Sequence, residues 1–214
     1  MKYSIAPSAL AYLFGDLLEE VFGKKSRFAS GEKIPCREAK VKKPDLASVM
    51  LTAAFVHLAE KNFLKLTTGA KGLILKSKTV FATLSPERSA QSFDHFEGSI
   101  ITNITGTEKK DDVGSIVRRL LERSTRDPRA QLIQETHEYL VGQGYFAKED
   151  RGGIAKILGK KTVPQCEKIA GLEQEALQLK EVVAAFQSSQ PEIYKLLWKG
   201  VASGIRSREM RDDY

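Results

Sequence analysis

DLASVMLTAAFVHLAEKN, residues 45–62, is followed directly by FLKLTTGAKGLILKSKTVFATL, residues 63–84. In the first stretch, apolar side chains recur at steps of three and four residues, which is the spacing of an amphipathic helix. Asp45 is a favoured N-cap residue, and Asn62 suits the end of a helix. The first stretch therefore predicts a helix over residues 45–62.

The second stretch predicts a β-hairpin. Two apolar runs, 63–66 and 73–75, flank the segment Thr68–Gly72, and its glycines permit the positive φ that a tight reversal requires. A helix that leads directly into a ribbon of two or three strands is typical of a winged helix. We therefore expect a mainly α fold class with short β-hairpins.

The rest of the chain predicts further helices and a second helix–hairpin unit. An apolar stripe from Pro7 to Phe22 predicts the first helix, and similar stripes follow at 92–106, from Asp111 or Asp112 onward, and from Pro128 onward. A strand at 145–147 and a hairpin at 150–163 come next. We expect a single domain over 1–214, with winged-helix-like units at about 45–84 and 90–165 and C-terminal helices at about 166–205.

Positive charge is concentrated in one segment of this 214-residue chain. The net charge is +7, and residues 24–43 carry eight lysines and arginines against two glutamates, a local charge of +6. Gly31, Pro35 and Pro44 argue against a long helix there. Such a basic loop attracts phospholipid headgroups, nucleic acid or acidic protein, although a solvated linker would have the same composition.

Cysteine usage and hydropathy favour a cytoplasmic location. Cys36 and Cys166 lack the spacing of a metal or redox motif, so we expect two reduced thiols, no disulfide and no metal site. No apolar run approaches the roughly 18–20 residues of a membrane span. Acidic residues interrupt the apolar N-terminal stretch, so a signal peptide is not expected.

The sequence offers no catalytic motif. LGKKTV suggests a phosphate-binding loop, but Gly153 lies six residues before Gly159 and Lys160 is followed by Lys161 instead of serine or threonine. His57 lies among apolar residues, as a core histidine would. No HExxH, CxxC or GxSxG motif occurs. We therefore expect no enzyme activity and no cofactor.

Three stretches resemble the Golgi phosphoprotein 3 family. They are MLTAAFVHLAEKNFLKL (50–66), SFDHFEGSIITNI (92–104), and VGSIVRRLLER (113–123) followed by ETHEYLVGQGYF (135–146). The resemblance extends over about residues 45–205. It implies a mostly helical domain without an active site, which acts as a peripheral membrane adaptor. Eukaryotic members bind phosphatidylinositol 4-phosphate at a basic surface and insert an apolar hairpin into the bilayer.

Carried over to this chain, the resemblance implies a lipid-binding site around the second hairpin. Its membrane-inserting residues would be Ile154, Ile157 and Leu158. Its headgroup-binding residues would be Arg126, Arg129, Arg151, Lys156, Lys160 and Lys161. Other family positions differ, since Leu51 replaces an arginine, and the family's arginine pair aligns with Ala130 and Ile133, one turn after Arg126 and Arg129. The only tryptophan is Trp198, so the family's N-terminal tryptophan has no counterpart. The implied partners are anionic membrane lipids, phosphoinositides among them, and the tails of cargo proteins.

Two other functions fit the same sequence. A winged-helix protein could bind nucleic acid, although the helix face expected to be exposed (Thr52, Glu60 and Lys61) is poor in residues that read base edges. A protein-interaction module could instead dock partners on the helix that carries Trp198. The membrane hypothesis requires residues 24–43 and 150–163 to share one face.

Overall fold

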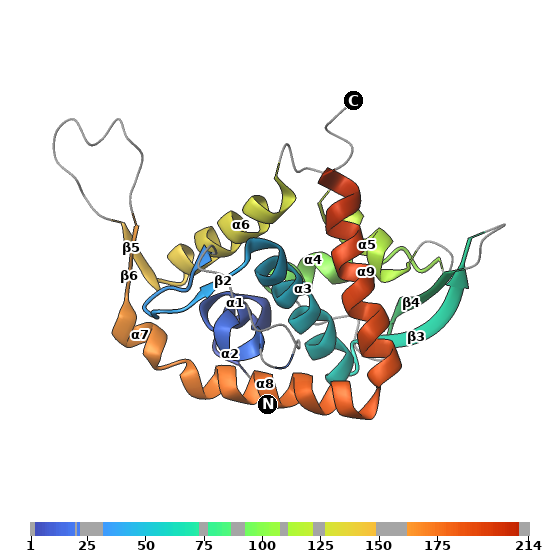
Figure 1. The fold of residues 1–214 in the computed structure, drawn as a ribbon, viewed down its shortest axis with the longest axis horizontal. Coiled ribbons are helices and arrows are strands. Elements are labelled where there is room, and N and C mark those ends of the chain that lie inside the picture. Colours follow the sequence, from blue (N-terminus) through green and yellow to red (C-terminus); the bar gives the residue numbers. More distant parts are fainter. Residues whose placement is uncertain are drawn as a thin grey trace.

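The computed structural model describes residues 3–19, 21, 32–72, 77–86, 93–107, 111–121, 127–148 and 162–209. Within these ranges the chain is mainly helical, and its strands form three antiparallel two-stranded hairpins (Figure 1). The expected fold class, mainly α with short hairpins, is confirmed. A helix leads into a hairpin twice, and these two hairpins lie at opposite ends of the longest axis of the molecule.

The described elements follow one another in this order: α1 (Pro7–Leu13), α2 (Gly15–Glu19), β1 (Glu32–Lys33), β2 (Lys40–Val41), α3 (Lys43–Glu60), β3 (Leu64–Lys71), β4 (Ser77–Leu84), α4 (His95–Thr102), α5 (Val113–Leu120), α6 (Pro128–Gly142), β5 (Phe146–Lys148), β6 (Thr162–Pro164), α7 (Cys166–Ala170), α8 (Glu173–Ser189) and α9 (Pro191–Glu209).

Helix α3 lies at the centre of the molecule. Every residue from Leu46 to Leu58 is buried, because α1, α4, α6, α8 and α9 all pack around this helix (Figure 1). A helix that is apolar on every side belongs to a core. The expectation that Thr52 is exposed is wrong, since its side chain is fully buried.

The ends of α3 follow simple backbone rules. The helix begins at Lys43, with Lys42 as its N-cap and a proline in its first turn, so the expected cap at Asp45 is wrong. Proline is favoured in the first turn, where its missing N–H is not needed. Asn62 has a φ of 57°, a left-handed conformation that ends the helix as expected.

Strands β3 and β4 form the longest hairpin, paired from Leu64 with Leu84 to Lys71 with Ser77. The expected turn at residues 68–72 is wrong, because β3 continues through Lys71. Gly69 is a strand residue, and a Cβ there would lie 2.7 Å from the Phe81 ring. Its missing side chain makes room for that ring. The expected strand at 73–75 lies outside the described residues.

Two further features of the helices are a break near the N-terminus and close approaches at glycines. The expected single N-terminal helix is wrong, because it breaks at Phe14 into α1 and α2. Gly15, which starts α2, approaches α3 so closely that a Cβ would lie 2.7 Å from Leu46. Helix α9 approaches α5 in the same way, since a Cβ at Gly204 would lie 2.7 Å from the Val117 Cβ.

No helix of the described segments combines the length and the apolar character that a bilayer crossing requires.

Candidate functional site

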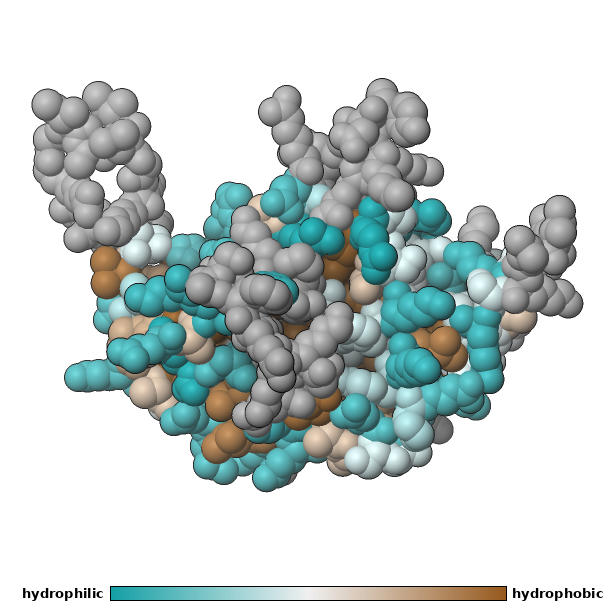
Figure 2. All heavy atoms as spheres, in the orientation of Figure 1, coloured by the Kyte–Doolittle hydropathy of each residue, from teal (hydrophilic) through white to brown (hydrophobic). Residues whose placement is uncertain are grey.

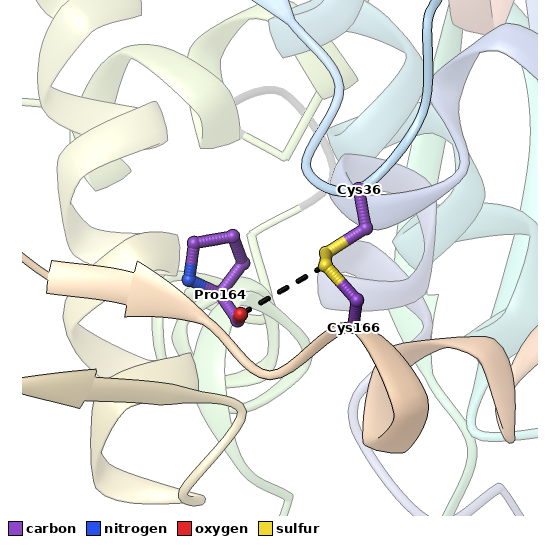
Figure 3. The surroundings of a disulfide bond; sticks show 3 residues. All are labelled: Cys36, Pro164 and Cys166. Carbon is purple, nitrogen blue, oxygen red and sulfur yellow. Dashed lines mark hydrogen bonds between the residues drawn. A yellow bond between two sulfur atoms is a disulfide. The ribbon is translucent and has the colours of Figure 1, made fainter.

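The described part of the basic segment is a short hairpin fastened by a disulfide. Cys36, between β1 and β2, is bonded to Cys166 at the start of α7, and their Cα atoms lie 5.4 Å apart (Figure 3). The expectation of two reduced thiols without a disulfide is therefore wrong. The two cysteines are 130 residues apart in the chain, so their spacing carried no sign of the contact.

This bond joins the described part of the basic segment to the chain just after the second predicted hairpin. Cys166 follows β6 by two residues, and β6 pairs with β5. The base of the β5–β6 hairpin thus lies beside β1–β2 (Figure 1). The tip of that hairpin lies outside the described residues, and with it all of these predicted site residues: Arg151, Ile154, Lys156, Ile157, Leu158, Lys160 and Lys161.

The cations of the β1–β2 hairpin have two different roles. Arg37 holds the hairpin in place, because its guanidinium lies 2.9 Å from Asp16 and 3.1 Å from Glu173 and covers the Phe14 ring. Lys33 and Lys40 are exposed and form a cross-strand pair. Like charges directly opposite each other destabilise a strand pair.

Arg129, one of the two arginines of the predicted pair, lies elsewhere. Arg129 is in the first turn of α6, where its backbone N–H donates to Asp127, the N-cap residue. Arg126 lies outside the described residues. Thirteen residues separate Arg129 from the end of α6 that leads into β5, which is about 20 Å of helix. The described structure therefore does not bring Arg129 to the base of the β5–β6 hairpin.

A cavity that the sequence did not indicate lies between the N-terminal segment, the end of α3, the start of α4 and the end of α6. Its volume is about 440 Å³, within the roughly 300–1,000 Å³ of small-molecule sites. Its aromatic lining consists of Tyr3, His57, Phe63, Phe93 and Tyr139. Its charged lining consists of Lys61, Asp94 and Glu97.

The aromatic rings around this cavity are held by one another. Phe63 and Phe93 meet edge to face with centroids 4.5 Å apart, and Tyr3 meets His57 at 5.3 Å. Tyr139 stacks on His95. Burial lowers the pKa of His57 and of His95 to about 4, so both imidazole rings are neutral at pH 7.

Glu97 is a buried carboxyl at this cavity. It is 1% exposed and accepts hydrogen bonds from the Ser8 backbone N–H at 2.9 Å and the Ser8 hydroxyl at 2.7 Å. It thereby caps α1, whose own N-cap residue, Ala6, has no side chain that can do so. Burial raises the pKa of Glu97 to about 7, against the opposing effect of the Ser8 hydrogen bonds. No cation of the described segments forms an ion pair with it.

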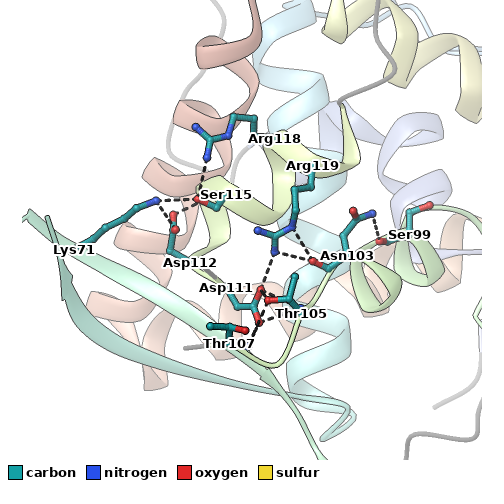
Figure 4. A network of polar contacts seen from close by, with 10 residues as sticks. All are labelled: Lys71, Ser99, Asn103, Thr105, Thr107, Asp111, Asp112, Ser115, Arg118 and Arg119. Carbon is teal, nitrogen blue, oxygen red and sulfur yellow. Dashed lines mark hydrogen bonds and ion pairs between the residues drawn. The ribbon is translucent and has the colours of Figure 1, made fainter. Parts of the chain in front are cut away.

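The acidic pair Asp111–Asp112 has a structural role (Figure 4). Asp112 caps α5, as expected, and binds Lys71 at the end of β3. Asp111 is fully buried and lies 2.8 Å from Arg119. These contacts hold the β3–β4 hairpin against α5. Across the residues that the structure describes, no group of histidine, cysteine or acidic side chains is arranged to hold a metal ion.

Comparisons of this chain with models of protein families, with curated proteins and with solved structures find no match. The resemblance to the Golgi phosphoprotein 3 family therefore stays a prediction.

Proposed function

We propose that this protein is a non-enzymatic adaptor that binds anionic membrane surfaces through the β1–β2 hairpin and the segment between β5 and β6. The observation that carries the proposal is the disulfide between Cys36 and Cys166. It joins the basic region 24–43 to the chain that leads out of the second basic hairpin. Cys36 lies within the first basic region, and Cys166 comes three residues after the end of the second predicted hairpin at residue 163.

Two features of the described surface support this proposal. The exposed pair Lys33 and Lys40 presents two cations on one face of β1–β2, and a basic residue near an anionic leaflet contributes about 1 kcal/mol to binding. Val163 in β6 is 41% exposed, and Figure 2 shows hydrophobic surface at the base of this hairpin. Cations beside an apolar surface suit the boundary between headgroups and acyl chains.

We propose that the protein binds anionic lipids as a class, and we name no single lipid species or cellular compartment. Arg129 lies far along α6 from the hairpin base, so we propose attraction to anionic lipid without a phosphoinositide pocket. The sequence predicts a cytoplasmic protein, whereas disulfides persist mainly in oxidising compartments. We therefore assign the membrane surface to no particular compartment.

Co-sedimentation with vesicles tests the proposal. The full chain is mixed with vesicles of phosphatidylcholine alone, or with added phosphatidylserine or phosphatidylinositol 4-phosphate, at low and high salt. We expect binding to both anionic compositions, weakened by salt because exposed charges are screened. Reversal of three cations in the variant K156E/K160E/K161E is expected to reduce binding roughly 100-fold, at about 1 kcal/mol per cation.

A matched variant controls for total charge. K195E/K199E/R206E makes the same change in charge on exposed positions of α9, away from the β5–β6 hairpin (Figure 1), and should keep most of the binding. Indifference of the wild-type chain to anionic lipid at low salt, or equal losses in the two variants, would refute the proposal.

The alternative of nucleic-acid binding finds no support at α3. In a winged helix, the helix before the hairpin would enter the major groove, but here it is buried from Leu46 to Leu58. A gel shift with duplex DNA distinguishes the two functions. Duplex affinity that falls steeply with salt would favour this alternative.

A further inference from the structure

We propose that the cavity beside Glu97 binds an organic ammonium group, carried either by a free small molecule or by a lipid headgroup. This site is separate from the basic hairpins, and the inference does not depend on the proposed membrane function. It rests on the aromatic lining of the cavity and on the two acidic residues that line it.

The aromatic lining favours a soft cation. Tyr3, Phe63, Phe93 and Tyr139 come from four separate parts of the chain and all line one cavity. The face of an aromatic ring attracts a cation, and several rings around one ammonium form the cage that recognises choline-like groups. A strongly hydrated metal ion would not gain from such a lining, because it prefers oxygen ligands.

The charges of the lining favour the same ligand. Two carboxyls, Asp94 and Glu97, outnumber the single lysine, Lys61. Asp94 occupies the N-cap position of α4, yet its side chain accepts no capping hydrogen bond, and it is exposed at the cavity. His57 is neutral at pH 7, because burial and the Lys61 ammonium lower its pKa to about 4. Once Glu97 is ionised, above pH 7, the two carboxylates outweigh the one ammonium of the lining.

Glu97 gives the binding a measurable proton signature. Its pKa is raised to about 7 by burial, and nearby Asp94 adds to that effect. Ser8 on α1 donates to Glu97, and the other titratable groups of the lining from other elements are Tyr3, His57 on α3, Lys61 directly after α3, and Tyr139 on α6. An ammonium ion in the cavity favours the carboxylate and lowers this pKa. Below pH 7, binding should release a proton, and affinity should increase from pH 6 to pH 8.

Isothermal titration calorimetry tests the inference on the full chain without vesicles. The probes are choline, its neutral tert-butyl analogue and a short-chain phosphatidylcholine below its micelle concentration. Titrations at pH 6 and pH 8, in buffers of different ionisation enthalpy, measure proton release. Binding of choline shows that a free small molecule can supply the ammonium group, whereas binding of the phosphatidylcholine alone shows a headgroup source.

Two variants of lining residues and one control variant extend the test. Glu97→Gln keeps an acceptor for Ser8 and should weaken ammonium binding roughly tenfold or more, with loss of proton release. Phe93→Leu should weaken binding several-fold, whereas Phe81→Leu, on β4 outside the cavity lining, should not. Thermal melts check that each variant is folded. Absence of binding by choline and by phosphatidylcholine, or equal binding of the neutral analogue, would overturn the inference.

Discussion

Opening the disulfide between Cys36 and Cys166 should destabilise the protein by several kcal/mol. The bond closes a loop of 130 residues. In the chain-entropy model, loss of such a cross-link costs about 5 kcal/mol at 25 °C, and measured losses are usually about 2–4 kcal/mol. Arg37 still joins the hairpin to Asp16 and Glu173 after reduction. These partly exposed ion pairs are present with and without the bond, so they leave the expected loss unchanged.

Urea unfolding of the oxidised chain, the reduced chain and the double variant C36S/C166S measures this effect. We expect the reduced chain and the double variant to unfold at similar, lower urea concentrations, and reductant to leave the double variant unchanged. Counting thiols by mass spectrometry before unfolding shows whether the bond has formed. If the oxidised chain contains two free thiols, or if its free energy of unfolding exceeds that of the reduced chain by less than 1 kcal/mol, this reasoning is refuted.

Three further changes test the packing and the buried charges. Gly204→Ala places a Cβ 2.7 Å from the Val117 Cβ and should lower the free energy of unfolding by about 1–3 kcal/mol. The control Gly142→Ala meets nothing within 4 Å and should leave the stability unchanged or raise it slightly. Thermal melts compare the two variants. Asp111→Ala removes a buried, ion-paired carboxylate and should cost about 3–5 kcal/mol in urea unfolding. Because the pKa of Glu97 is raised from 4.5 to about 7, the folded state binds more protons in that window. Wild-type stability should therefore fall relative to Glu97→Gln as pH increases from 4.5 to 7, by about 3 kcal/mol; a pH-independent difference between the two would contradict this assignment.

The parts of the fold that the sequence predicts correctly depend on local signals. Pro128 at the first turn of α6 and Asp112 as the cap of α5 follow from the chemistry of helix ends. The turn predicted at residues 68–72 is wrong because a glycine-rich segment is typical of a reversal of the chain. The role of Gly69 depends on Phe81 in the opposite strand, and such a contact is visible only once the strands are paired.

The candidate sites were less predictable, because they depend on contacts between distant segments. The pairing of Cys36 with Cys166 joins segments 130 residues apart, and the spacing of two cysteines does not encode it. In the sequence, Glu97 looks like any polar residue of a short helix, so no local pattern marks it as buried. One signal could have found it: α1 starts at Ala6 and Pro7 without a capping side chain, so its first turn needs an acceptor from elsewhere.

The central claim, that the segment between β5 and β6 enters an anionic membrane, can be measured by tryptophan fluorescence. The chain has one tryptophan, so the variant W198F/I157W reports from the predicted tip of that hairpin alone. With phosphatidylserine vesicles we expect a blue-shifted emission that brominated acyl chains quench, and no change with phosphatidylcholine alone. An emission that stays unshifted and unquenched, although the protein sediments with the anionic vesicles, would contradict insertion of this segment.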